Sequence, residues 1–153
     1  MEKKEQIYFL SGDTLENLRY NPQLEGFIKR DIEVLLLPDQ VDDFWVNEIN
    51  TYKNTELCSV GRSEIDLDKI KQLDPEKLTE DESEKSEEIN NLLDYIKTLL
   101  GDKVKEVRVS KKLVESPACL AVQAGAINIR MEKYLLDQKQ LSRKTAKILE
   151  INP

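Results

Sequence analysis

The chain has 153 residues, of which 39% are hydrophobic and 35% charged, and its formal net charge is -7 at pH 7. This length suits one domain of ordinary size or two small ones. An acidic chain repels phosphate groups, so nucleic acid is not an expected partner. No apolar run approaches the length of a membrane span and no signal-peptide core is present, so no membrane contact and a cytoplasmic location are expected.

The residues that enzymes use most often are scarce. Histidine is absent, which excludes Ser-His-Asp and Cys-His nucleophiles and metal sites built on histidine. The five glycines are too widely spaced to form a phosphate-binding loop. Cys58 and Cys119 lie in no C-x-x-C motif and are interpreted as small buried hydrophobes, with a redox or metal role as the alternative. Catalysis is not excluded, but its usual groups are missing.

The stretch QIYFLSGDTLENL predicts a short strand followed by a helix. Ser11, Asp13 and Thr14 are candidate N-caps, because a short side-chain oxygen can accept the first free backbone N–H groups. In the next stretch, NPQLEGFIKRD, Asn21 is the expected cap and Pro22 the first residue of a second helical piece. Three apolar side chains of this piece are expected to face inward: Leu24, Phe27 and Ile28.

The apolar run IEVLLLP predicts a strand that is buried on both faces, as in a parallel sheet. The next stretch, DQVDDFWVNEINTY, predicts a helix with Phe44 on the flank of its inner stripe and Val46 off that stripe. The stripe itself consists of Val41, Trp45, Ile49 and Tyr52. ELCSV then predicts a third strand. Together these elements predict a small αβα layer.

Composition changes after Gly61. Residues 61–90 include eleven acidic and five basic side chains, which indicates a solvated linker and an exposed helix face. Helical spacing of apolar residues returns at 89–100, and Gly101 suits a left-handed C-cap. VKEVRVS, KKLVESPACLAVQ and AKILEINP each contain a predicted strand. We therefore expect an α/β chain with a small αβα subdomain at 1–62, an acidic linker and helix start at 63–84, and a mixed α/β domain at 85–153.

The stretch AGAINIRMEKYLL, which starts at Ala124, predicts a helix with apolar residues on two faces. One face carries Ile129 and Leu136, which are expected to pack on the sheet. The other face is expected to be at least half exposed and carries Ile127, Met131, Tyr134 and Leu135. An exposed apolar patch normally marks a binding site, and flexible Met and amphipathic Tyr suit varied partners. The alternative is that both faces are buried between domains or in a dimer.

Three acidic residues support a different class of function. Asp39, Asp42 and Asp43 follow the strand that ends at Leu37, and they could form an acidic metal site in a small receiver-like or metal-dependent enzyme domain. We interpret them instead as acids at the N-terminus of a helix, where the helix dipole favours negative charge. The enzyme domain is kept as the alternative to a binding module.

Several stretches resemble the heat shock protein 90 chaperones, and their bacterial members in particular. Residues 5–60 are similar to the small subdomain that closes the family's middle segment. VKEVRVSKKLVESPACLAV, MEKYLLDQ and LEINP are similar to successive blocks of its C-terminal domain, whereas residues 61–90 match weakly. The resemblance implies a molecular chaperone that binds partly folded client proteins in protein folding and the stress response.

The resemblance also implies parts that this sequence does not match. The family's N-terminal domain, with its ATP and Mg, has no counterpart here, so this chain is expected to hold no cofactor or metal and to be no enzyme, whereas its full-length parent would be an ATPase. The family's dimer helices follow its Asn-Pro block, and this sequence ends at such a block. It is therefore expected to be a fragment that is monomeric or weakly associating, from a parent that forms a homodimer.

By position, the resemblance implies a client-binding site on two separate elements. The matching residues are Phe44, Trp45, Ile127, Met131, Tyr134 and Leu135. Phe44 matches an exposed aromatic residue that faces the client cleft, but Trp45 follows it directly. Helical spacing places Trp45 on the core stripe and Phe44 beside it, and which of the two faces the cleft is left open.

Overall fold

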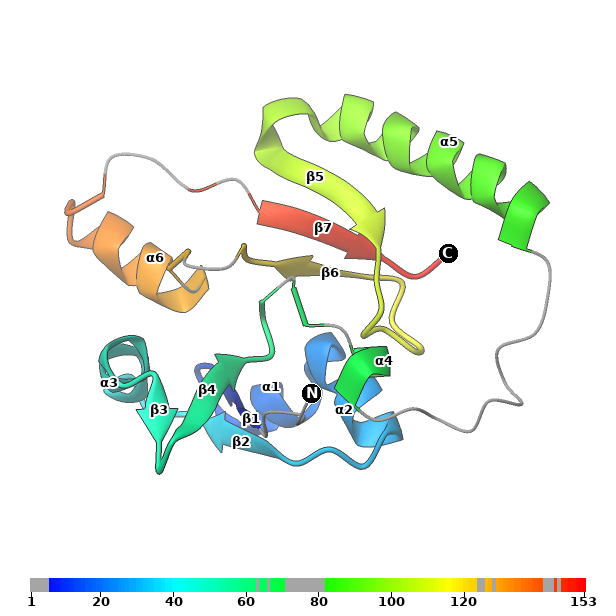
Figure 1. The fold of residues 1–153 in the computed structure, drawn as a ribbon. Coiled ribbons are helices and arrows are strands. Elements are labelled where there is room, and N and C mark those ends of the chain that lie inside the picture. Colours follow the sequence, from blue (N-terminus) through cyan, green and yellow to red (C-terminus); the bar gives the residue numbers. More distant parts are fainter. Residues whose placement is uncertain are drawn as a thin grey trace.

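The structure is a computed structural model that describes residues 6–62, 64–65, 67–70, 82–123, 126–127, 129–141, 145 and 147–153. Within these residues, helices surround a four-stranded sheet and a three-stranded sheet (Figure 1). This arrangement confirms the mixed α/β class predicted from the sequence.

The four-stranded sheet has the order β2-β1-β4-β3. Its strands are β1 (Gln6–Ser11), β2 (Val34–Leu37), β3 (Thr51–Tyr52) and β4 (Thr55–Ser59). Strand β1 pairs in parallel with both β2 and β4, and Tyr8, Phe9 and Leu10 are buried on its two faces. The prediction that IEVLLLP is buried on both faces was wrong, because β2 lies at the edge of the sheet and Leu35 is half exposed.

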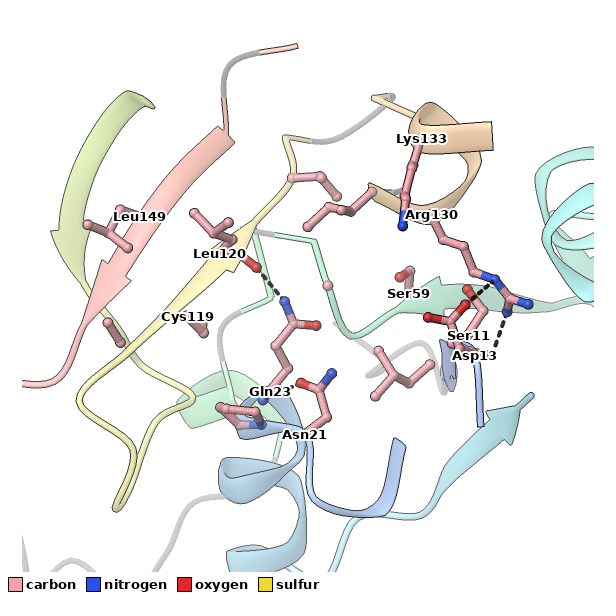
Figure 2. A pocket seen from close by; sticks show the side chains of 17 residues that line it. Ser11, Asp13, Asn21, Gln23, Ser59, Cys119, Leu120, Arg130, Lys133 and Leu149 are labelled. Atoms are coloured by element: carbon pink, nitrogen blue, oxygen red, sulfur yellow. Dashed lines mark hydrogen bonds and ion pairs between the residues drawn. The ribbon is translucent and has the colours of Figure 1, made fainter. Parts of the chain in front are cut away.

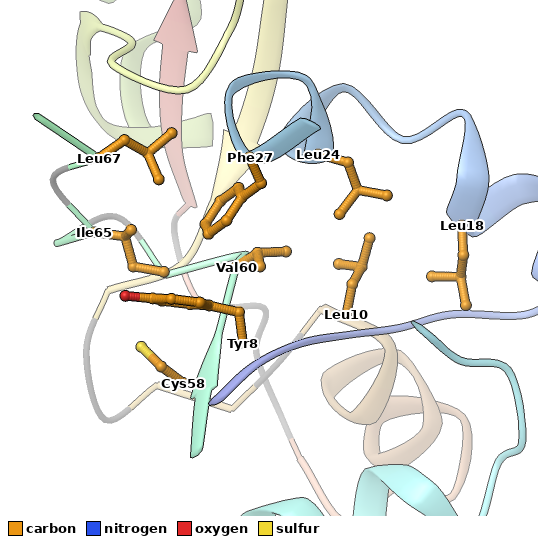
Figure 3. Packing of buried hydrophobic residues seen from close by; sticks show 9 residues of the cluster. All are labelled: Tyr8, Leu10, Leu18, Leu24, Phe27, Cys58, Val60, Ile65 and Leu67. Carbon is orange, nitrogen blue, oxygen red and sulfur yellow. The ribbon is translucent and has the colours of Figure 1, made fainter. Parts of the chain in front are cut away.

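Helices cover both faces of this sheet. One face packs against α1 (Leu15–Arg19), η1 (Pro22–Leu24), α2 (Glu25–Lys29) and α4 (Leu67–Ile70). Figure 3 shows the core between them, in which the rings of Tyr8 and Phe27 meet edge to face. The predicted caps are confirmed, since Thr14 accepts from Asn17 N and Asn21 accepts from Gln23 N. Ile28, which was expected to face inward, is exposed.

The opposite face packs against α3 (Asp42–Glu48), where the predicted stripe needs correction. The helix stops at Glu48 because the chain turns into a hairpin, with Lys53 and Asn54 in the left-handed region (φ 47 and 67). The predicted stripe residues Val41, Ile49 and Tyr52 are therefore exposed. Val46, which was expected off the stripe, is buried against Phe9 and Leu57, and Trp45 packs beside it as predicted.

The three-stranded sheet has the order β5-β7-β6, with β5 (Val104–Val109), β6 (Ala118–Ala121) and β7 (Lys147–Ile151). Strand β7 is parallel to β5 and antiparallel to β6. Helix α5 (Glu82–Leu100) covers one face, where its apolar side chains pack on Val104, Val107 and Ile151. Gly101 follows with φ +52, as predicted for a C-cap, and opens the short helix η3 (Gly101–Lys103). Helix α6 (Ile129–Asp137) lies between β6 and β7 in the chain.

The two sheets are joined by direct contacts. A parallel bridge links Arg62 to Val122, and the side-chain amide of Gln23 donates to the carbonyl oxygen of Leu120 at 2.6 Å. Gly26 is tightly enclosed at this junction, because a Cβ there would lie 2.5 Å from the carbonyl oxygen of Lys112. Much of the predicted acidic linker at 63–84 lies outside the described residues, and the boundaries at 62 and 85 stay predictions.

Candidate functional site

The candidate site lies where α6 contacts α3 (Figure 1). The rings of Phe44 on α3 and Tyr134 on α6 meet edge to face, with 5.8 Å between their centroids and 84° between their planes. Phe44 is 48% exposed and Tyr134 46% exposed. Two residues that are 90 positions apart in the sequence and were both predicted for the client site therefore form one half-exposed aromatic surface.

The two aromatic residues of α3 point in different directions. Trp45 is partly buried in the core with Phe9 and Val46, and its indole N–H donates to the Asp42 carboxylate at 2.8 Å. Phe44 instead meets Tyr134 of α6. The structure thus places Phe44, rather than Trp45, at the surface between the two helices.

The prediction that one face of α6 packs on the sheet and the other is exposed was wrong in part. Met131 is only 8% exposed, although its face was expected to be at least half exposed. Ile129, which was expected to pack on the sheet, is 42% exposed, and Leu136 is partly buried. Of the other predicted residues, Ile127 is exposed and Leu135 is partly buried. The exposed apolar surface here therefore centres on Phe44 and Tyr134, with Met131 inside it.

A charged residue that the sequence reasoning did not single out orients α6. The guanidinium group of Arg130 contacts Asp43 on α3, with 3.2 Å between Nε and Oδ2, and Asp13 after β1, with 3.3 Å between Nε and Oδ1. It also donates to the carbonyl oxygen of Gly12 at 2.5 Å. The side chains of Arg130 and Asp43 are largely buried, so solvent screens this contact less than it would a surface ion pair.

A second charged residue anchors the same helix on its other side. The Glu132 carboxylate is buried and accepts hydrogen bonds from the Lys147 ammonium group of β7 and from the backbone N–H of Thr145. Burial acts to raise the pKa of Glu132, but these bonds outweigh it and the net pKa is lowered, so the group stays ionised. These anchors join residues far apart in the chain, and helical periodicity of apolar residues gives no signal for them.

Two hollows border this surface. The larger, about 640 Å³, lies between the ends of β1 and β4 on one side and β6 and α6 on the other (Figure 2). Its lining is mixed, and includes Leu10, Ser11, Ser59, Leu120, Ile129 and Lys133. The smaller, about 200 Å³, is lined by Phe44, Met131 and Tyr134 together with charged side chains, among them Arg130 and Asp43. Hollows lined by both apolar and charged side chains suit the binding of segments that carry both kinds of side chain.

Two of the three acidic residues considered as a metal site, Asp42 and Asp43, bind other side chains of the protein. Asp42 accepts from Trp45, and Asp43 pairs with Arg130. Both lie in the first turn of α3, as the interpretation as helix N-terminal acids predicted. In the part of the chain that the structure describes, no group of three or more His, Cys, Asp or Glu side chains is placed to hold a metal ion.

A half-exposed apolar patch on layered α/β units is typical of the class of proteins that bind other molecules through a surface. The model of the Hsp90 protein family matches residues 1–153. The chain belongs to the Hsp90 family.

Curated relatives agree with this assignment. The chaperone protein HtpG of Wolbachia pipientis wMel is 45% identical over 150 residues, which is 98% of this chain and 24% of that protein. The proteins of the same name from Rickettsia bellii (strain OSU 85-389) and Rickettsia akari are 47% and 48% identical, and each alignment covers 99% of this chain and 24% of the relative. The chain thus spans about a quarter of the length of these relatives. Among the described helices, none has the length and apolar character needed to cross a membrane.

Proposed function

We propose that this chain is the client-binding part of an Hsp90-type chaperone and that Phe44 and Tyr134 form the centre of its client surface. The observation that carries the proposal is their edge-to-face contact in a half-exposed state. A partly folded protein exposes apolar side chains that a folded protein buries. A pair of half-exposed rings offers such side chains apolar contact area, and because apolar contact depends little on the exact client sequence, it suits many different clients.

The surroundings of the two rings support this role. Ile127 is exposed near the start of α6, and Leu135 is partly buried next to Tyr134 in the chain. Trp45 supports the surface indirectly. Its ring packs in the core under α3 and so fixes that helix on the sheet. A client segment that contacts both Phe44 and Tyr134 touches two units of the fold at once, and its binding would therefore respond to their relative position.

The family membership supports further proposals about the whole protein. Residues 1–62 would correspond to the small subdomain of the chaperone's middle segment, 63–84 to an acidic linker and helix start, and 85–153 to part of the C-terminal domain. The ATPase activity, with ATP and Mg, would belong to another part of a cytoplasmic, homodimeric parent. The relatives that share this stretch are named chaperone proteins, and this chain matches about a quarter of each.

Suppression of client aggregation tests the proposal. The wild-type chain should slow the light scattering of a heat-denatured model protein such as citrate synthase, and Phe44→Ser and Tyr134→Ser should each reduce that effect. Tyr20→Ser is the matched control, because Tyr20 is an exposed aromatic residue that lines neither hollow described above. If Tyr20→Ser reduces suppression as much as Phe44→Ser does, general surface stickiness explains the effect and the proposed site is wrong.

A further inference from the structure

We infer that Arg130 is a positioning residue of the client surface. Its contacts hold α6 against α3, so that the client-binding side chains cover one another. Loss of these contacts exposes those side chains. This inference rests on the proposed function and adds control of that surface. It concerns a charged residue that neither the family match nor the apolar pattern assigns to the site.

The contacts of Arg130 join two separate units. Its three partners, Asp43, Asp13 and the carbonyl oxygen of Gly12, all belong to the four-stranded unit, whereas Arg130 itself belongs to the helix between β6 and β7. Figure 2 shows the Arg130 side chain extending from α6 to Asp13 at the border of the larger hollow. A single side chain thus makes several polar contacts between the two units at this point.

The other anchor of α6 lies within its own unit. Glu132 binds Lys147 of β7 and the backbone of Thr145, so this contact persists if α6 moves away from α3. Loss of the Glu132 contact and loss of the Arg130 contacts should therefore affect α6 differently. Loss of the Glu132 contact detaches α6 from its own sheet, whereas loss of the Arg130 contacts separates α6 from α3 and leaves the helix attached to β7.

Apolar side chains that are buried or in contact with one another lie next to the Arg130 contacts. Met131 follows Arg130 directly and is 8% exposed, and the ring of Tyr134, one helical turn later, meets the ring of Phe44. Separation of α6 from α3 would uncover the facing sides of both rings and open the hollow that they line together with Met131. In the tied state a client competes with these internal contacts, so its apparent affinity is reduced by the small population of the released state.

Removal of the charge at position 130 tests the inference. The probe is fluorescein-labelled, reduced and carboxymethylated α-lactalbumin, which stays unfolded, and its binding is followed by fluorescence anisotropy. Arg130→Gln should bind the probe about three- to tenfold more tightly than the wild type, as expected from the loss of partly buried ion pairs. Asp13→Asn, which removes the exposed partner, should act in the same direction with a smaller effect. Lys139→Gln is the control, because it removes a positive charge from the exposed turn that follows the same helix, and Lys139 lines neither hollow.

Amide hydrogen exchange provides a second readout that does not depend on a client. In Arg130→Gln, exchange should rise across 129–137 and stay unchanged in β7. Equal or weaker probe binding by Arg130→Gln, or unchanged exchange in α6, would overturn the inference. If the wild type and all variants fail to bind the probe, the proposed function fails, and the exchange result alone then decides whether Arg130 holds the helix.

Discussion

Lys112 and Glu150 form an ion pair inside the protein, with 3.6 Å between Nζ and Oε2 and with side chains that are 1% and 2% exposed. The Lys112 ammonium group also donates to the carbonyl oxygens of Val60 and Arg62, at 3.1 and 2.8 Å, and so joins the second unit to the end of β4. Burial lowers the pKa of Lys112, and the neighbouring Glu150 carboxylate opposes that shift. Because both groups are removed from water, the contact depends on both partners being present.

Replacement of Lys112 by Met should therefore cost about 1–3 kcal/mol of unfolding free energy, because buried polar groups lose their donor while Glu150 keeps its ion pair with Arg108. Two carbonyl oxygens at the junction lose their donor. Lys103→Met, at an exposed position of the same unit, should change stability by less than about 0.5 kcal/mol. Urea unfolding followed by circular dichroism measures both, and a cost below about 1 kcal/mol for Lys112→Met would show that the ion pair is dispensable.

Glu25 should make stability depend on acid pH. Burial acts to raise its pKa, but the Ser116 hydroxyl and the backbone N–H groups of Glu115, Val114 and Ser116 outweigh it and lower the pKa from about 4.5 to about 2. A lowered pKa stabilises the folded state above pH 4.5, and this contribution disappears as the pH falls from 4.5 to 2.

Glu25→Gln should therefore be less stable than the wild type at pH 6, and the difference should shrink as the pH is lowered through this window. Chemical unfolding at several pH values measures it, with Glu33→Gln as a control for the loss of one exposed negative charge. A difference that stays constant down to pH 2.5 would mean that the bonds to residues 114–116 do not depend on the charge of Glu25.

The two apolar neighbours of Arg130 should differ in their effect on folding. Met131 is buried, so Met131→Ala should destabilise the protein by about 2–4 kcal/mol. Ile129 is 42% exposed, so Ile129→Ala should cost less than about 1 kcal/mol. Thermal unfolding of the two variants compares them directly. The reverse order would restore the assignment made from the sequence, in which Ile129 packs on the sheet.

Cys119 should be slow to react in the folded protein. Burial, followed by the nearby Glu150 carboxylate, raises the pKa of its thiol to about 11, so the reactive thiolate is rare at pH 8. Its alkylation by iodoacetamide at pH 8 should be about a hundredfold slower than that of a free cysteine peptide, and unfolding in guanidinium chloride should remove the difference. Rapid modification of the native protein, located by mass spectrometry, would contradict this environment.

Local features of the fold could be predicted from the sequence. The caps at Thr14 and Asn21 and the left-handed Gly101 depend on residues within one turn of the chain, and all three predictions are confirmed. The length of α3 was missed because the helix was extended into the hairpin. The signal was present, since Lys53-Asn54 occupies a two-residue turn and asparagine tolerates the left-handed conformation.

Features that depend on distant parts of the chain could not be predicted in this way. The apolar run before Pro38 indicates a strand, but only the order of the strands decides that β1 is central and β2 lies at the edge. The orientation of α6 shows the same limit. Its apolar pattern left two faces open, and the choice between them follows the partners of Arg130 and Glu132, which lie on other elements.

The central claim is that Phe44 and Tyr134 together form the client surface, and a binding titration of the double variant Phe44→Ser/Tyr134→Ser tests it most directly. With labelled, carboxymethylated α-lactalbumin as the client, the double variant should bind at least about tenfold more weakly than the wild type, since loss of two aromatic contacts removes about 1.4 kcal/mol or more. The matched control, Tyr20→Ser/Tyr95→Ser, also removes two exposed aromatic residues and should bind as the wild type does. Equal affinity of the wild type and the Phe44/Tyr134 variant would contradict the account.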